Sequence, residues 1–200
     1  MNSGATADRV YDALKRQLLS GAVLPGEKLD PTRFAEALNS SVTPVRDALH
    51  RLAGERLVES RPSEGFHLPI ATEPGLRDLY LWNGALLKLM VRTWPRDGAT
   101  RVVTHLPADL ERAPVALFDA FAARAGNGEM SAQLDSANDR LATARAAERR
   151  VLADQETELR AFAVAADNAP AAAILRLVTA YHRRRLHAVP DIIRAMYRRA

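Results

Sequence analysis

The chain of 200 residues contains no cysteine. This absence excludes disulfide scaffolds, thiolate zinc sites, iron–sulfur clusters and a cysteine nucleophile. The sequence also lacks an apolar run of roughly 18 residues, so we expect neither a membrane span nor a secretory signal core. Because 48% of the residues are hydrophobic, buried cores can form. We therefore expect a soluble, cytoplasmic protein without a membrane partner.

The familiar sequence motifs of catalysis are absent as well. The chain has no P-loop, no Gly-x-Gly-x-x-Gly, no His-Glu-x-x-His and no Gly-x-Ser-x-Gly. Paired carboxylates occur only on polar helix faces, where solvation is their ordinary state. We therefore predict no catalytic residues and no cofactor, and a protein that is not an enzyme.

Positive charge is concentrated at one end of the sequence. The net charge is +4 and the isoelectric point is near 9.8, yet residues 1–70 hold nine basic and nine acidic side chains. From Arg176 to the end, seven arginines stand against one aspartate. Cations near a helix C-terminus complement the helix dipole and stay solvated, which we expect for His182–Arg185 and for the final arginines. Contact with nucleic acid or with another anionic partner is the alternative.

Residues 1–70 have the pattern of a winged helix-turn-helix domain. Apolar side chains at helical spacing predict a helix over 6–20, and a second, short helix follows over 31–38. Thr43 is the expected cap of a third helix, with Pro44 at its first position. Residues 57–60 and 66–69 read as two strands joined by a turn. Three helices and a two-stranded wing are the expected content of this domain.

The rest of the chain shows only helical patterns. We predict a linker over 71–76 and a helical effector-binding or dimerisation domain over 77–200. Its expected helices are the segments 76–94 and 109–125, an alanine-rich stretch over 129–166 with at least one break, and two last helices separated at Pro190. The expected fold class is mainly α, a winged helix-turn-helix followed by an all-α bundle.

Four segments resemble the GntR family of bacterial transcription regulators. They are L-L-S-G-A-V-L-P-G-E-K-L (18–29), A-E-A-L (35–38), T-P-V-R-D-A-L-H-R-L (43–52) and E-R-L-V-E-S-R-P-S-E-G-F (55–66). The segment L-R-D-L-Y-L-W (76–82) resembles the first effector-domain helix of the FadR subfamily. The resemblance implies a homodimer, for example a repressor, on a pseudo-palindromic double-stranded DNA operator, with a small-molecule effector that alters its affinity.

The resemblance also implies where DNA would bind. Arg46 occupies the matched helix start and Gly65 the wing tip, where only glycine lets the backbone approach a groove so closely. The candidate DNA-binding residues are Thr32, Arg33, Ser41, Thr43, Pro44, Arg46, Arg51, Gly65 and His67. The family commonly has arginine at the positions of Thr32 and Val42, so the operator sequence does not transfer. Arg33 can partly replace the first of these arginines.

The bundle departs from its relatives at the expected metal ligands. Many effector domains of this subfamily bind a divalent ion through one Asp and three His, with Asp and His four residues apart. Here Asp135 is followed by Asp139 and Thr143, and the histidines of the domain are His105, His182 and His187. We therefore predict no metal site. Asn83 and Asn138 lie among apolar residues and are the candidates for effector binding.

Two functions remain open at this stage. The first is the operator-binding homodimer, held together mainly by the bundle. The second is a winged-helix module for protein interaction or dimerisation with little specific DNA binding, which the neutral N-terminal domain favours. The two apolar stripes of the bundle serve either as monomer core, which we favour, or as interface. They are Leu79, Leu86 and Met90, and Ile174, Leu177, Val178 and Tyr181.

Overall fold

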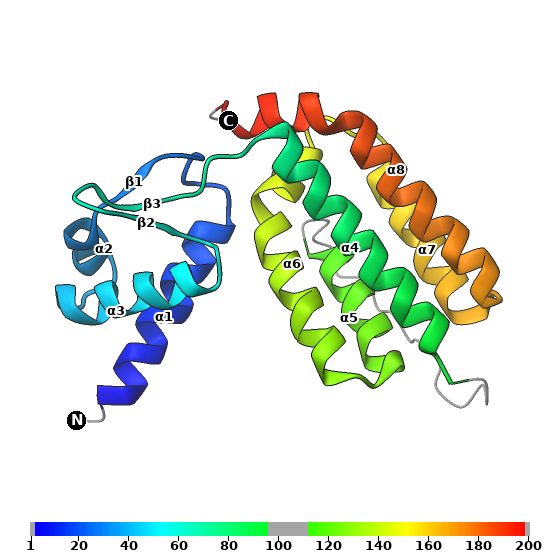
Figure 1. Ribbon diagram of the computed structural model, residues 1–200, viewed down its shortest axis with the longest axis horizontal. Coiled ribbons are helices and arrows are strands. Elements are labelled where there is room, and N and C mark those ends of the chain that lie inside the picture. Colours follow the sequence, from blue (N-terminus) through cyan, green and yellow to red (C-terminus); the bar gives the residue numbers. More distant parts are fainter. Residues whose placement is uncertain (1–2, 96–111, 199–200) are drawn as a thin grey trace.

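The computed structural model describes residues 3–95 and 112–198, which form two bodies joined by an extended segment (Figure 1). The first body contains three helices and a small sheet, and the second is a helical bundle. The N-terminal body has one hydrophobic core, to which each of its three helices contributes. The expected fold class, a winged helix-turn-helix followed by an all-α bundle, is confirmed.

Local signals explain the helix-turn-helix. Helix α1 (Ser3–Leu19) packs against α3 (Val42–Gly54), and the short helix α2 (Pro31–Ala37) lies between them in sequence. Asp30 caps α2, because its carboxylate accepts a hydrogen bond of 2.9 Å from the Thr32 amide. Asn39 then takes a left-handed conformation, with φ of +48°, which asparagine tolerates in a turn. The chain can therefore reverse direction within four residues before α3.

The start of α3 differs from the prediction. The helix begins at Val42 and its N-cap is Ser41, so Thr43 is not the cap and Pro44 is the third helical residue. An amide in the first turn has no intrahelical acceptor, and proline therefore costs no hydrogen bond at this position either. The proline signal identifies the first turn of a helix but not its first residue.

The wing contains one strand more than predicted. Strands β2 (Glu59–Arg61) and β3 (Gly65–His67) form the expected antiparallel hairpin, and β1 (Lys28–Leu29) pairs with the other edge of β3. The sheet order is β1-β3-β2. A strand of two residues is too short for an alternating pattern, so β1 depends on a partner about 37 residues away in sequence, as the pairing of Leu29 with Phe66 shows.

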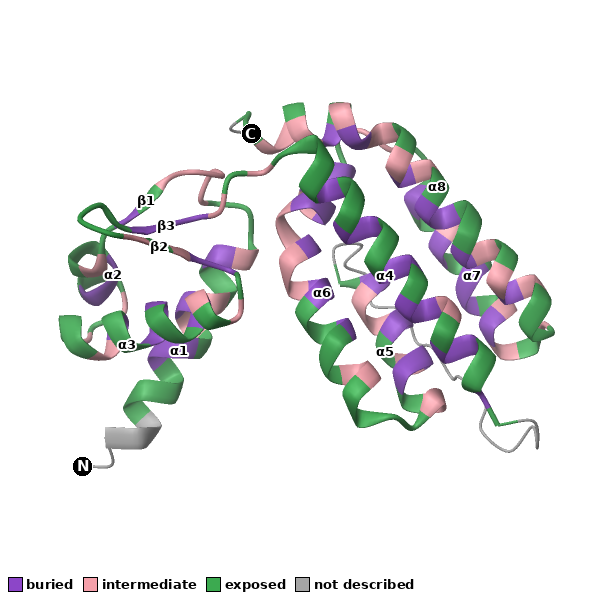
Figure 2. Ribbon diagram, in the orientation of Figure 1, coloured by how far each residue is buried: buried purple, intermediate pink, exposed green. Residues whose placement is uncertain are grey.

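Helix α4 (Glu73–Thr93) is the central element of the bundle. Thr72 caps it by accepting a hydrogen bond from the Gly75 amide, so the helix begins inside the segment expected as linker. Helix α4 contacts α5 (Ala113–Ala125), α6 (Gly128–Glu148) and α8 (Ala171–Met196), and α7 (Gln155–Asn168) packs on α5 and α8. Figure 2 shows the buried residues of these helices turned inward. The expected break within 129–166 is confirmed between α6 and α7.

The two helices predicted at the C-terminus are one helix. Helix α8 continues through Pro190, although proline has no amide to donate to the preceding turn. Val189 and Ile192 on either side of it are fully buried, so packing against the bundle outweighs the lost hydrogen bond. In Figure 1 the last turns of α8 run at an angle to the rest of the helix, as expected for a proline kink.

A buried ion pair connects four helices of the bundle. The Arg185 guanidinium of α8 donates to Glu148 of α6 at 2.9 Å and to Glu158 of α7 at 3.0 Å, and the Tyr80 hydroxyl of α4 donates to Glu148 at 2.6 Å. Arg185 also covers the ring of Tyr181. The expectation that His182–Arg185 is a solvated helix end is wrong, because the run lies in the middle of α8 and its first and last residues face the core.

Removing one partner of this pair should destabilise the bundle strongly. We expect Glu148→Gln to lower the free energy of unfolding by about 3 kcal/mol, since it leaves a buried guanidinium without full compensation. Chemical denaturation measures this change. Glu156→Gln removes an exposed partner of Arg160 on α7 and should cost less than about 0.5 kcal/mol. Equal effects of the two substitutions would contradict a structural role for the buried pair.

Candidate nucleic-acid interface

Helix α3 buries one face and presents the other to solvent. Val45, Ala48, Leu49 and Leu52 lie in the core, while Thr43 and Arg46 are exposed. Arg46 makes no ion pair with any carboxylate in the described part of the chain, including the neighbouring Asp47. The guanidinium of the first turns of α3 is thus free to bind a ligand.

Other predicted residues surround this part of α3. Thr32 and Arg33 are exposed on α2, Ser41 is the exposed N-cap of α3, and Pro44 is partly buried in its first turn. Val42, where the family commonly has an arginine, is 37% exposed and can offer only an apolar contact. The structure therefore brings six predicted residues to the helix-turn-helix surface, and its cations are Arg33 and Arg46. The six are Thr32, Arg33, Ser41, Thr43, Pro44 and Arg46.

The exposed tip of the wing consists of the Gly65 backbone, and the positive charge of the nearby Arg61 is paired. Gly65 is exposed and has φ of +89°, a conformation that residues with a Cβ rarely adopt. Arg61 pairs with Glu59 at 2.7 Å and with Glu64 at 3.9 Å, so its charge is compensated. Lys28 of β1 is exposed, and its Cε would lie 3.9 Å from a Cβ at position 65, which is ordinary van der Waals contact. Sequence patterns missed Lys28, because only the third strand brings it beside the wing.

Two predicted DNA-binding residues lie differently from the others. The His67 side chain is buried in the sheet, so it does not reach the surface. Arg51 is exposed but turned toward α1, where its guanidinium lies 3.9 Å from the centre of the Tyr11 ring and 3.6 Å from Asp8. These placements leave Arg46 as the principal cation of α3 on the outer surface.

A second ionic contact fixes the winged domain against the bundle. Lys15 of α1 pairs with Glu55 at 3.1 Å and with Asp139 of α6 at 2.7 Å. Burial opposes the charge of Lys15, but hydrogen bonds to Asp139 and Glu55 outweigh it and raise the pKa of the ammonium group. Lys15 therefore connects the first helix of one domain, the end of α3 and the other domain.

The candidate effector residues meet in the core of the bundle. Asn83 of α4 and Asn138 of α6 are both buried, and their amide groups lie 3.5 Å apart. Arg145 donates to Asn138 at 2.9 Å, and His182 Nε2 lies 3.0 Å from Asn83 Oδ1. Asn138 Nδ2 and one guanidinium nitrogen of Arg145 are buried and have no hydrogen-bond partner among the residues that the structure describes. The four side chains form a buried polar cluster, and two of its hydrogen-bond donors have no acceptor among the described residues.

The histidine of this cluster is electrically neutral near pH 7. Burial lowers the pKa of His182 to about 3, and the positive charges of Arg185 and Arg145 act in the same direction. In the described part of the chain, no three His, Asp or Glu side chains lie close enough together to hold a metal ion. His105 lies outside the described residues. Within the same residues, no helix is long and apolar enough to cross a membrane.

Comparison with known proteins assigns the N-terminal domain to a family. Residues 6–68 match the gntR family of bacterial regulatory proteins. The HTH-type transcriptional regulator McbR of Escherichia coli (strain K12) is 41% identical over 71 residues, which cover 36% of this chain and 31% of McbR. The HTH-type transcriptional regulator YdhC of Bacillus subtilis (strain 168) is 25% identical over 109 residues, 54% of this chain and 49% of YdhC. The matched segments thus span 31% and 49% of the length of these two relatives.

Solved structures share the whole fold at low sequence identity. A GntR transcriptional regulator from Rhodococcus sp. RHA1 superposes with a TM-score of 0.79 and 18% identity, covering 94% of this chain and 98% of that one. The structure of E. coli McbR/YncC gives a TM-score of 0.69 at 18% identity, with 93% and 97% covered. These likenesses extend the shared fold through the helical domain, as the FadR-like resemblance implied. Residues 6–68 are therefore a domain of the gntR family of bacterial regulatory proteins, and the described chain shares the fold of these solved structures.

Proposed function

We propose that the protein is a transcription regulator that binds a pseudo-palindromic DNA operator as a homodimer in the bacterial cytoplasm. The observation that carries this proposal is Arg46, in the first turns of α3 of a winged helix that matches the gntR family. Its guanidinium is exposed and makes no ion pair with any other described residue. In helix-turn-helix proteins, the N-terminal residues of the second helix of the motif contact base edges in the major groove. An arginine at that place can bind guanine with two hydrogen bonds.

The surrounding residues complete a plausible contact surface. We assign Ser41, Thr43 and the first turn of α3 to the groove, and Thr32 and Arg33 of α2 to the adjoining phosphates. The wing would approach the neighbouring groove through Gly65, with Lys28 on a phosphate. His67 and Arg51 are left out, because one is buried and the other is held against α1.

Loss of the Arg46 guanidinium should weaken specific binding. We expect Arg46→Ala to cost about 1–3 kcal/mol in operator affinity and to leave the fold intact, because the side chain is exposed and has no partner within the described residues. A mobility-shift titration with DNA from around the gene measures this. Arg176→Ala, an exposed arginine early in α8, is the matched control and should bind like the wild type.

The same titration tests the alternative, a winged helix retained for protein interaction. The balanced charge of residues 1–70 favours that alternative, because nonspecific affinity for DNA comes mainly from phosphate neutralisation. Binding to phosphates is strongest at low salt. If no duplex binds even there, the operator proposal fails and the interaction module takes its place.

The dimer has a candidate surface on α4. Leu81, Ala85 and Leu89 follow each other at steps of four residues, and all three are exposed, with Leu81 at 56% and Leu89 at 44%. We name them the α4 stripe. Of the apolar residues considered from the sequence, Leu177 is partly buried and the others, including Leu79, Leu86 and Met90, are buried in the monomer core. A second copy of the chain is the occupant that we propose for the α4 stripe, since two operator half-sites require two recognition helices.

Charge on the α4 stripe should separate the protomers. We expect Leu81→Glu combined with Leu89→Glu to give a monomer by light scattering coupled to size exclusion, because two carboxylates would be desolvated in the interface. Val164→Glu changes an exposed apolar residue of α7, 65% exposed, and should stay dimeric. A dimeric double variant would exclude the α4 stripe, and a monomeric wild type would exclude the homodimer.

For the effector, we propose a ligand with a carboxylate or carbonyl that accepts hydrogen bonds in the Asn83–Asn138 cluster. The buried, unpartnered donors of Asn138 and Arg145 support this choice. Such a ligand should raise the melting temperature of the wild type by mass action but not that of Asn138→Leu. A thermal-unfolding screen of small organic acids measures the effect. Equal shifts in both proteins would place the ligand elsewhere.

A further inference from the structure

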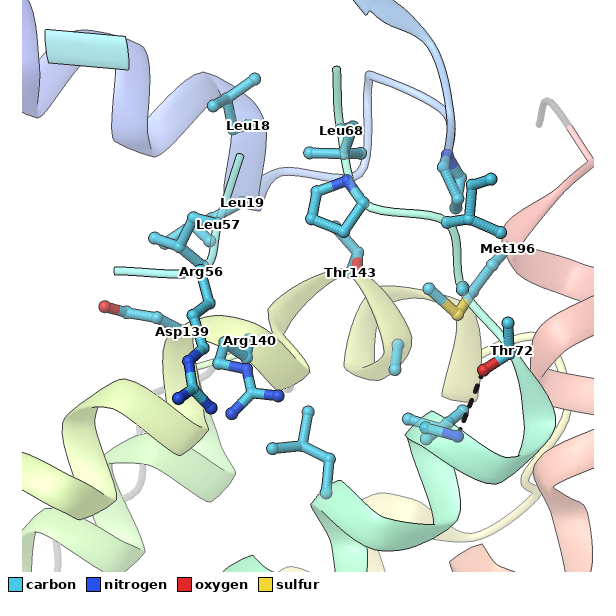
Figure 3. A pocket seen from close by; sticks show the side chains of 18 residues that line it. Leu18, Leu19, Arg56, Leu57, Leu68, Thr72, Asp139, Arg140, Thr143 and Met196 are labelled. Carbon is cyan, nitrogen blue, oxygen red and sulfur yellow. Dashed lines mark hydrogen bonds between the residues drawn. The ribbon is translucent and has the colours of Figure 1, made fainter. Parts of the chain in front are cut away.

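A cavity of about 190 Å³ lies between the two domains, away from the DNA-facing surface and from the Asn83–Asn138 cluster. Its walls come from α1, the segment 68–72, α4, α6 and the end of α8, and most of its lining is apolar (Figure 3). Leu18 and Leu57 belong to the winged domain, and Leu79 and Met196 belong to the bundle. The cavity therefore exists only while the two domains are docked.

Two arginines stand at the edge of this cavity. Arg56 follows α3 in the winged domain and Arg140 belongs to α6, and Figure 3 shows their guanidinium groups side by side. Both also line a neighbouring cleft of about 620 Å³, together with Trp82, so they lie where the interdomain cavity meets this cleft. Burial lowers the pKa of Arg140, and the charge of Arg56 lowers it further.

In the described part of the chain, no carboxylate forms an ion pair with either of these two arginines. Among the described residues, neither Arg56 nor Arg140 makes an ion pair, while Asp139 and Glu55 beside them are engaged with Lys15. Asp78 on the rim of the cleft is the remaining acidic group. Arg56 also has φ of +61°, a strained conformation for arginine that the surrounding structure must hold. The fold keeps two unpaired cations together beside an apolar space.

We propose that this site binds a small amphipathic anion, an organic acid whose carboxylate lies between Arg56 and Arg140 and whose short apolar body fills the interdomain cavity. Two guanidinium groups offer charge-assisted hydrogen bonds to one carboxylate, and the bound anion relieves their mutual repulsion. The apolar lining selects a hydrocarbon body. Because both domains contribute to the site, the ligand favours the docked arrangement over any other.

Octanoate is a suitable probe, and octanol is its uncharged counterpart. Isothermal titration of the full chain without DNA measures binding, so the result does not depend on the proposed operator function. We expect saturable binding of octanoate, at least tenfold weaker binding in Arg140→Gln and in Arg56→Gln, and much weaker binding of octanol. Arg176→Gln removes an exposed charge outside the site and should bind octanoate like the wild type.

Two further variants separate the head and body of the ligand. Thr143 lines the cavity, so the larger side chain of Thr143→Phe should fill it. We expect this variant to lose most of its affinity for octanoate and to keep its affinity for inorganic phosphate. Asp78→Asn removes the acidic group at the rim and should strengthen octanoate binding. The proposal is overturned if octanoate does not bind at millimolar concentration, if octanol binds equally well, or if Arg140→Gln binds like Arg176→Gln.

Discussion

The buried pair of Arg185 and Glu148 is the interaction on which the bundle depends. Two full charges lie at 1% and 2% exposure, and a pair removed from water to this extent is tolerated only when its remaining atoms are hydrogen-bonded. Glu158 and the Tyr80 hydroxyl supply those bonds, and they come from two further helices. The pair therefore fixes α4, α6, α7 and α8 relative to one another, while two apolar clusters of the bundle supply the burial.

Helix α4 connects the buried ion pair to the surfaces that we propose to be functional. It is fixed in the bundle by Tyr80, its N-terminus follows the wing after the connecting residues 68–72, and its outer side holds the α4 stripe. Lys15 fixes the winged domain from the other direction through Asp139 of α6. Contacts with α4 and α6 thus hold three features in place: the helix-turn-helix surface, the proposed dimer surface and the interdomain cavity. In the proposed dimer, a ligand that acts on the docking of the two domains would also act on the spacing of the two α3 helices.

Local signals made the winged domain predictable, and contacts distant in sequence account for the errors. Pro31, Pro44 and the glycine at position 65 act within a few residues, so α2, α3 and the hairpin were found to within about two residues of their observed bounds. Strand β1 exists only through β3, and α8 passes Pro190 only because Val189 and Ile192 are buried. Likewise, no residue near Arg185 in sequence indicates that Arg185 pairs with Glu148 and Glu158. The two asparagines of the bundle were predicted from their apolar surroundings, whereas Arg145 and His182 entered that cluster only in the structure.

The balanced charge of the winged domain limits what its DNA contacts can achieve alone. With as many acidic as basic side chains over residues 1–70, the general attraction to phosphate is weak, and affinity must come from a few well-placed groups such as Arg46. A single winged helix with so few cations gains most from being linked to a second copy, because the second binding event then becomes intramolecular. In the proposed homodimer, the α4 stripe and the domain contacts of Lys15 would therefore matter for DNA affinity as much as α3 itself, because they would set whether both copies of Arg46 can reach their grooves together.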